Sequence, residues 1–203
     1  DTRLICLNNA NNPTARSSDR RVHGAGGRHR AQLGAFVLVD EVYLPLVGTE
    51  DFASIADIYE RGVATNSLSK TYSVPGARIG WTVSNKELAD RFRVYRDYTM
   101  ICDGVFNDAL AVHVLRNRDK VLERNRAIVT GNLAVLERWL KGQPKLSFVK
   151  PRAGTTAFLK MEFDMPSADF CRGLLAEKGV LLVPGSVMDR EGYLRIATPI
   201  RRK

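Results

Sequence analysis

The sequence contains few residues that could hold a metal ion or a disulfide network. It has three cysteines and three histidines, namely Cys6, Cys102, Cys171, His23, His29 and His113. The cysteines are scattered and no CxxC pair occurs, which argues against both a disulfide framework and a zinc site. Since the histidines have no ligand spacing either, we expect no bound metal. This cysteine usage fits a reducing compartment, so we expect a cytoplasmic protein.

Long apolar runs are also missing. No stretch approaches the roughly 18–20 apolar residues that a membrane-spanning helix needs, and we expect no signal peptide. The 203 residues are 44% hydrophobic and 26% charged, which is typical of a globular protein with one domain, or one domain and part of another. We therefore expect no membrane partner.

Acidic residues do not balance the basic ones, and the net charge is +9. Most of this excess lies in two short segments, because residues 16–30 carry +4 and the last three residues carry +3, which leaves +2 for the remainder. A nucleic-acid-binding protein is expected to place its positive charge along one helix or sheet face. We therefore expect no nucleic-acid partner.

Apolar patterning predicts an α/β chain. Buried strands are predicted at residues 3–7, 35–39, 62–67, 79–83, 146–149, 155–161, 180–183 and 193–196. Helices are predicted after a capping box at Ser84–Glu87, with Leu88, Phe92 and Tyr95 on one face, and at residues 104–116, 119–141 and 170–178. Residues 16–33 show neither the apolar periodicity of a helix nor that of a strand, and we expect them to be disordered.

The order of these elements predicts two domains. The first comprises residues 1–118 and the strands predicted before the long helix. The second, residues 119–203, begins with the long helix and continues with strands around one further helix, which is typical of a smaller α/β domain.

The most informative segment is residues 66–81, NSLSKTYSVPGARIGW. It places Lys70 directly after a predicted strand, with Arg78 eight residues later. Upstream, the apolar run 35–39 leads into the sequence DEVY, which contributes Asp40 and Tyr43. A lysine, an acid, a phenol and an arginine at strand ends suit pyridoxal 5′-phosphate. Lysine forms a Schiff base with the aldehyde of this cofactor, and an aspartate partner tunes its pyridine nitrogen.

Several motifs in the same order resemble the class I/II aminotransferases, which are fold-type I pyridoxal-phosphate enzymes. The matching segments are NNPT at 11–14, DEVY at 40–43, SLSK at 67–70, GARIG at 76–80, LLVPG at 181–185 and YLRI at 193–196. Together they cover nearly the whole chain. The resemblance implies a partial large domain, with a mostly parallel sheet and helices on both faces, followed by an incomplete smaller domain.

The resemblance also implies a role for each matching residue. Lys70 would hold the cofactor and then move a proton, Asp40 would pair with the pyridine nitrogen, and Tyr43 and Asn12 would bind its phenolic oxygen. The phosphate would be bound by Ser67 and Arg78. Asn12 and Arg195 would bind the substrate, with the arginine on its α-carboxylate. The catalytic residues are accordingly predicted to be Lys70, Asp40 and Tyr43.

The implied function is transfer of an amino group between an amino acid and a 2-oxo acid through a Schiff base at Lys70, in a homodimer. Two alternatives remain open. One is a lyase, cyclase, oxidase or racemase with the same fold and cofactor, because the pocket decides the fate of the carbanion. The other is a non-catalytic remnant or sensor domain.

The sequence departs from the family pattern in three places. It begins at the strand before NNPT, Ala15 stands where the family has glycine, and it stops soon after Arg195. We therefore expect a fragment shortened at both ends, with poor activity or none by itself.

Overall fold

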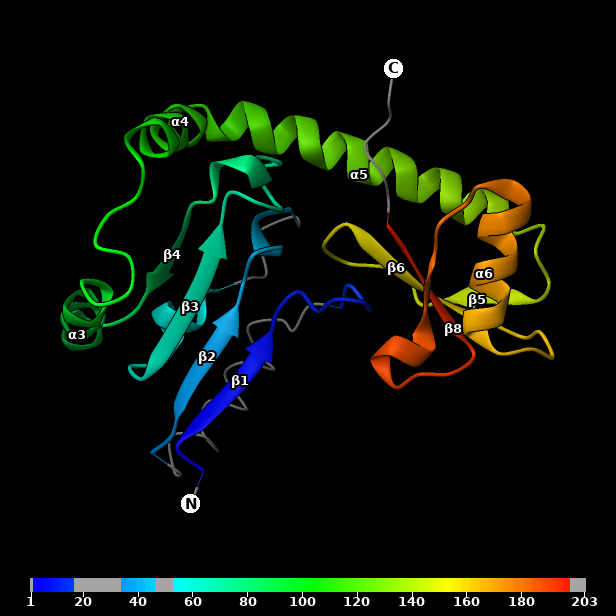
Figure 1. The fold of residues 1–203 in the computed structure, drawn as a ribbon, viewed down its shortest axis with the longest axis horizontal. Coiled ribbons are helices and arrows are strands. Elements are labelled where there is room, and N and C mark those ends of the chain that lie inside the picture. Colours follow the sequence, from blue (N-terminus) through cyan, green and yellow to red (C-terminus); the bar gives the residue numbers. More distant parts are fainter. Residues whose placement is uncertain (1, 17–33, 47–52, 198–203) are drawn as a thin grey trace. The chain divides into compact units, whose positions relative to one another are not determined.

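The computed structural model describes residues 2–16, 34–46 and 53–197. It divides into two compact units, one formed by Asp1–Ala10 and Ser17–Asn125, the other by Asn11–Arg16 and Arg126–Lys203 (Figure 1). The division falls inside the long helix, whereas the sequence analysis placed a domain boundary between residues 118 and 119. The predicted disorder of residues 16–33 lies outside the described residues, apart from Arg16, which is exposed.

The first unit is built on a four-stranded mixed sheet in the order β1-β2-β3-β4. Its strands are β1 (Leu4–Asn8), β2 (Phe36–Asp40), β3 (Gly62–Ser67) and β4 (Gly80–Val83). The first three run parallel, with Asn8 opposite Asp40 and Asp40 opposite Thr65, whereas β4 is antiparallel to β3. The carboxyl ends of the three parallel strands therefore meet at one edge, which is where ligands bind in open α/β sheets.

Apolar side chains on β2 and β3 form the first core of this unit. Val37 and Val39 are completely buried, and they pack with Ala64 and with Ile55 of the short helix α2 (Ile55–Ile58). Alternate strand residues point to one face, so this core fixes which side chains β2 directs toward α2. It also fixes the position of Asp40 at the end of the strand.

A second core holds the loop that follows β3. Leu68, Tyr72 and Ala77 pack against Ala111 and Val114 of α4 (Val105–Arg116). Val121 and Leu122, in the first turns of α5 (Arg118–Leu140), also pack against this cluster. Residues 68–77 are therefore anchored from both sides of Lys70, although they are not part of a regular strand.

The helix α3 (Lys86–Arg96) begins one residue later than the predicted capping box requires. Asn85 is its N-cap, and the Asn85 side chain accepts a hydrogen bond from the Leu88 amide at 2.9 Å. The prediction of Ser84 as the cap is wrong, because Ser84 Oγ instead donates to the Asn85 carbonyl oxygen. The predicted apolar face is not buried within this chain, since Phe92 is 40% exposed and Tyr95 71% exposed.

The second unit contains an antiparallel four-stranded sheet in the order β5-β6-β8-β7. Its elements are β5 (Leu146–Phe148), β6 (Thr156–Met161), α6 (Ser167–Lys178), β7 (Val183–Pro184) and β8 (Tyr193–Ala197). The helix α6 ends at Gly179, whose φ of 65° lies in the left-handed region that glycine adopts without a steric penalty.

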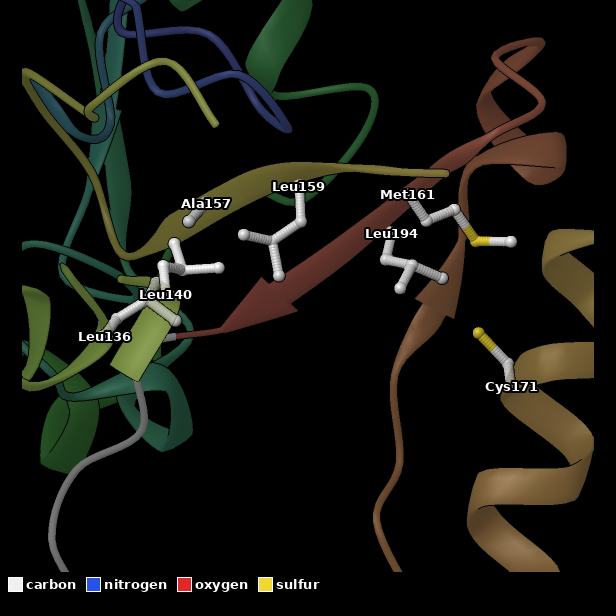
Figure 2. Packing of buried hydrophobic residues seen from close by; sticks show 7 residues of the cluster. All are labelled: Leu136, Leu140, Ala157, Leu159, Met161, Cys171 and Leu194. Carbon is white, nitrogen blue, oxygen red and sulfur yellow. The ribbon is translucent and has the colours of Figure 1, made fainter. Parts of the chain in front are cut away.

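One face of this second sheet packs against two helices. Leu136 and Leu140 come from α5 and Cys171 from α6, and they enclose alternate residues of β6 together with Leu194 of β8. Figure 2 shows Leu159 and Leu194 between the two helices, with Met161 directed toward Cys171. The opposite face of the sheet carries the intervening residues of β6 and β8.

Three short 3₁₀ turns complete the described elements: η1 (Leu44–Leu46), η3 (Pro75–Ala77) and η4 (Gly185–Met188). Among the helices that the structure describes, none has both the length and the apolar character needed to cross a lipid bilayer.

Candidate active site

A cavity of about 340 Å³ opens at the carboxyl ends of β2 and β3. It is lined by Asp40, Val42, Thr65, Asn66, Ser67, Ser69 and Lys70. Three of the residues predicted from the sequence therefore lie around one space: the carboxylate of Asp40, the hydroxyl of Ser67 and the amine of Lys70. They come from two adjacent parallel strands and from the turn after the second strand.

Asp40 ends β2, and its Oδ1 accepts a hydrogen bond from the Val42 amide at 3.0 Å. This bond turns the chain away from the sheet immediately after the strand. Because one carboxylate oxygen is used locally, the orientation of the side chain is fixed. The half-buried Asp40 carboxylate thus keeps acceptor capacity on the lining of the cavity.

Lys70 lies in a tight turn that leaves β3. The Ser69 amide donates to Ser67 Oγ at 3.2 Å, and the Ser73 amide donates to the Lys70 carbonyl oxygen at 3.1 Å. The Lys70 side chain is exposed, so its amine is accessible from the cavity while the backbone around it is held. Gly80 allows β4 to approach here, because a Cβ at this position would lie 2.9 Å from the Asn66 carbonyl oxygen.

Buried polar residues connect this turn with the chain after β2. Thr71 is completely buried, and its hydroxyl donates to the carbonyl oxygen of Val42. Asn125 on α5 donates from Nδ2 to the Thr71 carbonyl oxygen at 2.8 Å. Asn66 Nδ2 donates to the Glu41 carbonyl oxygen at 3.3 Å. The segments that carry Lys70 and Asp40 are therefore tied to one another and to the helix behind them.

Glu41 is a buried acid beside the cavity. Its side chain is 4% exposed, and Oε1 accepts a hydrogen bond from the Ile55 amide at 2.8 Å, at the start of α2. Burial raises the pKa of the Glu41 carboxyl, against the opposing effect of the Ile55 hydrogen bond. From the sequence, Glu41 was noted only as part of DEVY, and neither Thr71 nor Asn125 was predicted to belong to the site.

Three predicted cofactor residues, Asn12, Tyr43 and Arg78, do not line this cavity. Tyr43 is only 5% exposed and packs in the interior of the first unit. Arg78 is exposed, adopts the left-handed conformation at the end of η3 (φ 51°), and donates from Nη1 to the Pro75 carbonyl oxygen at 2.8 Å. Their assigned roles toward the cofactor stay predictions.

The two predicted substrate residues belong to the second unit, where they contact one another. Arg195 on β8 donates from Nη1 to Asn12 Oδ1 at 3.4 Å. The segment around Asn12 is held to the same sheet, since Thr156 Oγ1 donates to the Pro13 carbonyl oxygen at 3.2 Å. The structure therefore pairs a guanidinium group with an amide oxygen, and Asn12 in turn is positioned by its neighbours.

The groups around the first cavity fit pyridoxal 5′-phosphate. A carboxylate suits a protonated pyridine nitrogen, an amine suits an aldehyde, and the hydroxyls of Ser67 and Ser69 suit phosphate oxygens. The position at the carboxyl ends of parallel strands agrees with the general location of such sites. The fit rests on Asp40, Ser67 and Lys70, because Asn12, Tyr43 and Arg78 are outside the lining.

Comparison with known families and proteins gives a consistent result. The family described as "Aminotransferase class I and II" matches residues 1–200. An aspartate aminotransferase from Thermotoga maritima is 31% identical over 99% of this chain and 53% of its own length. Capreomycidine synthase from Streptomyces vinaceus is 28% identical over 96% of this chain and 51% of its own length.

Solved structures show the same similarity. A PLP-dependent aminotransferase from Streptococcus suis superposes with a TM-score of 0.93 and 47% identity, over 97% of this chain and 52% of that chain. The PLP-dependent cyclase OrfR superposes with a TM-score of 0.86 and 25% identity, over 97% of this chain and 54% of that chain. The chain thus spans about half the length of the relatives it matches, which have the fold-type I architecture.

Proposed function

Because the chain belongs to the class I and II aminotransferase family, we propose that it contributes a pyridoxal-phosphate site to the transfer of an amino group between an amino acid and a 2-oxo acid. The observation that carries this proposal is the cavity at the carboxyl ends of β2 and β3, which Asp40, Ser67 and Lys70 line together. The named aminotransferase relatives support the reaction class.

The cofactor, when bound, supplies an electron sink that stabilises negative charge on the substrate Cα. We assign the chain's own residues to the remaining tasks. The amine of Lys70 holds the cofactor covalently at its aldehyde carbon and, once released, carries the proton to and from Cα. The Asp40 carboxylate keeps the pyridine nitrogen protonated, and the Ser67 hydroxyl donates to the phosphate.

We also propose roles for the four remaining predicted site residues, which are Tyr43, Arg78, Asn12 and Arg195. The phenol of Tyr43 and the amide of Asn12 would bind the cofactor's phenolic oxygen, and Arg78 would bind the phosphate. Arg195 would bind the substrate α-carboxylate through its planar fork of donors. Its contact with Asn12 Oδ1, at 3.4 Å, supports this role because it orients the guanidinium group.

We further propose a homodimer in a reducing compartment. Large apolar side chains remain exposed along α3, α4 and their connection, including Tyr98 at 85% and Phe106 at 90%. Apolar surface of this kind marks an interaction site more often than a free surface. The three cysteines are free thiols, which suits a reducing cytoplasm.

The function is tested by loading the chain with pyridoxal 5′-phosphate and assaying it with a panel of amino acids and 2-oxoglutarate. We expect saturable cofactor binding that Lys70→Ala abolishes and Lys86→Ala leaves unchanged, because Lys86 lies exposed on α3. Formation of a keto acid and glutamate in equal amounts would support transamination. If the Lys70→Ala chain, at high concentration, binds the cofactor as tightly as the native chain does, the proposed site is wrong.

A second outcome at the same site is cyclisation of an amino acid. It is favoured by the similarity to capreomycidine synthase and to the cyclase OrfR. The same loaded chain distinguishes the two reactions, because cyclisation yields a product that retains the amino nitrogen and consumes no 2-oxo acid. Mass spectrometry of the products decides between them.

A further inference from the structure

A second cavity, of about 380 Å³, lies wholly within the second unit and has both polar and apolar residues in its lining. Its lining includes Arg16, Ser147, Phe158, Lys160, Arg190 and Tyr193. It shares no residue with the cavity around Lys70, and the proposed function gives it no task. Its volume lies within the range of about 300–1,000 Å³ that is typical of small-molecule sites.

The floor of this cavity is the sheet face opposite the helices. Ala157, Leu159 and Met161 of β6 are buried in the core against α5 and α6, so the alternating residues Phe158 and Lys160 point to the other side. Ser147 and Tyr193 flank Lys160 directly across the sheet, one on β5 and one on β8. The register therefore lines up a hydroxyl, an ammonium and a phenol in one row.

Two arginines also line the cavity, and a backbone hydrogen bond holds the main chain at each of them. The amide of Arg190 donates to the Gly185 carbonyl oxygen at 3.0 Å, and the carbonyl oxygen of Arg16 accepts from the Asn11 amide at 2.8 Å. Within residues 2–16, 34–46 and 53–197, neither guanidinium group forms an ion pair. No carboxylate of these described residues therefore competes with an anion for either side chain.

Two acidic residues close to the lining residues in sequence, Glu162 and Glu191, are engaged, whereas Asp189, directly before Arg190, forms no ion pair within the described residues. Glu162 pairs with Lys160 at 2.9 Å. The carboxylate of Glu191 accepts hydrogen bonds from the amides of Ser167 at 2.6 Å and Gly192 at 3.0 Å, at the start of α6. Since Lys160 is shared with Glu162, the lining cations that have no carboxylate partner within the described residues are Arg16 and Arg190.

Aromatic rings form another part of the lining. Phe158 and Tyr193 stack on each other with centroids 4.8 Å apart and planes inclined by 15°. Both side chains are only half-buried. Because each ring covers one face of the other, only their outer faces and edges remain for a ligand, and a planar ring such as a nucleic-acid base can stack on one such outer face.

We propose that this cavity binds a phosphate monoester that carries a planar ring, of the size of a mononucleotide. The phosphate lies between Arg16 and Arg190, whose guanidinium groups bind phosphate oxygens in a bidentate manner. The ring lies against Phe158 and Tyr193, and the Ser147 hydroxyl is available to a sugar hydroxyl. The lining shares no residue with the Lys70 cavity, and Arg195, to which the proposed function gives the substrate carboxylate, lies opposite Phe158 in the same sheet.

The test is calorimetric titration of the full chain with AMP as the probe, beside adenosine, inorganic phosphate and ribose 5-phosphate. We expect saturable AMP binding, with each of the three fragments bound about tenfold more weakly or worse, because each lacks one of the two contacts. Ribose 5-phosphate binding as tightly as AMP would overturn the role of the rings. An absence of saturable AMP binding at millimolar concentration would overturn the site.

Variants locate the site. Arg16→Ala together with Arg190→Ala should weaken AMP binding about tenfold or more, whereas Arg138→Ala on α5 should change nothing. If circular dichroism shows that the double variant is unfolded, the salt dependence of AMP binding by the native chain provides the same test. An AMP affinity that does not fall as ionic strength rises contradicts the proposal. Lys70→Ala must leave AMP affinity unchanged, which separates this site from the proposed catalytic one.

Discussion

The side-chain amide of Asn125 donates a hydrogen bond to the carbonyl oxygen of Thr71, at 2.8 Å, across 54 residues of sequence. Both residues are buried, with 5% and 0% of their surfaces exposed. Thr71 directly follows Lys70, so this bond fixes the turn that presents the amine. Thr71 in turn donates to the Val42 carbonyl oxygen, two residues beyond Asp40.

Removing this donor should both destabilise the chain and disturb the site. Asn125→Asp keeps the volume and the acceptor that Arg124 uses, but at neutral pH it replaces the donor to the buried Thr71 carbonyl with a carboxylate oxygen that repels it. We expect a loss of about 1–3 kcal/mol in the free energy of unfolding and weaker cofactor binding. Urea denaturation and a cofactor titration measure the two effects.

Thr130→Ala is the control for Asn125→Asp, because Thr130 is exposed on the same helix. A change within about 0.5 kcal/mol is expected there. The positioning role of Asn125 would be contradicted by an Asn125→Asp chain that binds the cofactor as tightly as the native chain does.

Asp40→Asn separates the charge of this residue from its structural role. Asparagine retains the Oδ1 acceptor for the Val42 amide, so the turn after β2 should form as before. Without the negative charge the pyridine nitrogen loses its partner, and we expect whatever transamination the native chain performs to slow on the order of 100-fold, as when other preorganised electrostatic contacts are lost. Steady-state kinetics of the loaded enzyme provide the measurement.

Asp57→Asn is the matched control. It should leave the rate of transamination unchanged, because Asp57 is exposed on α2. Equal rates for Asp40→Asn and the native enzyme would remove Asp40 from the mechanism.

Glu41 should make stability depend on pH. Burial raises its pKa above the ordinary value of 4.5, so the folded chain holds this proton more tightly than the unfolded chain. The stabilisation is therefore fully present below pH 4.5 and is lost as the pH rises through the folded-state pKa. Glu41→Gln keeps an acceptor for the Ile55 amide and stays uncharged.

We accordingly expect the stability of Glu41→Gln, relative to the native chain, to improve as the pH rises from 4 to 7 in urea denaturation. A difference between the two chains that stays constant over this range, or that changes in the opposite direction, would show that burial does not govern this carboxyl.

The core of the second unit should respond strongly to truncation. Leu194 is 1% exposed between α5 and α6 (Figure 2), so Leu194→Ala leaves a cavity and should cost about 2–5 kcal/mol. Leu181 is 76% exposed, and Leu181→Ala should cost less than about 0.5 kcal/mol. Comparable losses for the two variants in urea denaturation would contradict the described packing.

The elements of this fold could be predicted largely from the sequence because their apolar periods are regular. The strand predicted at 62–67 is observed as Gly62–Ser67, and the helix predicted at 104–116 as Val105–Arg116. The cap of α3 was mistaken because Ser84 and Asn85 are both good capping residues. Only the backbone conformation decides between them.

The site was predictable in part, for a different reason. Asp40, Ser67 and Lys70 follow directly after strands, so sequence order and the parallel topology suffice to bring them together. Thr71 and Asn125 form their bond across 54 residues, and no local pattern distinguishes a buried asparagine on a helix from an exposed one. Their role becomes visible only when the helix and the turn are placed in space.

The most direct test of the account is borohydride reduction of the chain loaded with pyridoxal 5′-phosphate, followed by peptide mapping. We predict that the reduced cofactor is attached to Lys70, and that Lys70→Ala prevents the labelling. Attachment predominantly to another lysine, or labelling of the Lys70→Ala chain to the same extent, would contradict the account.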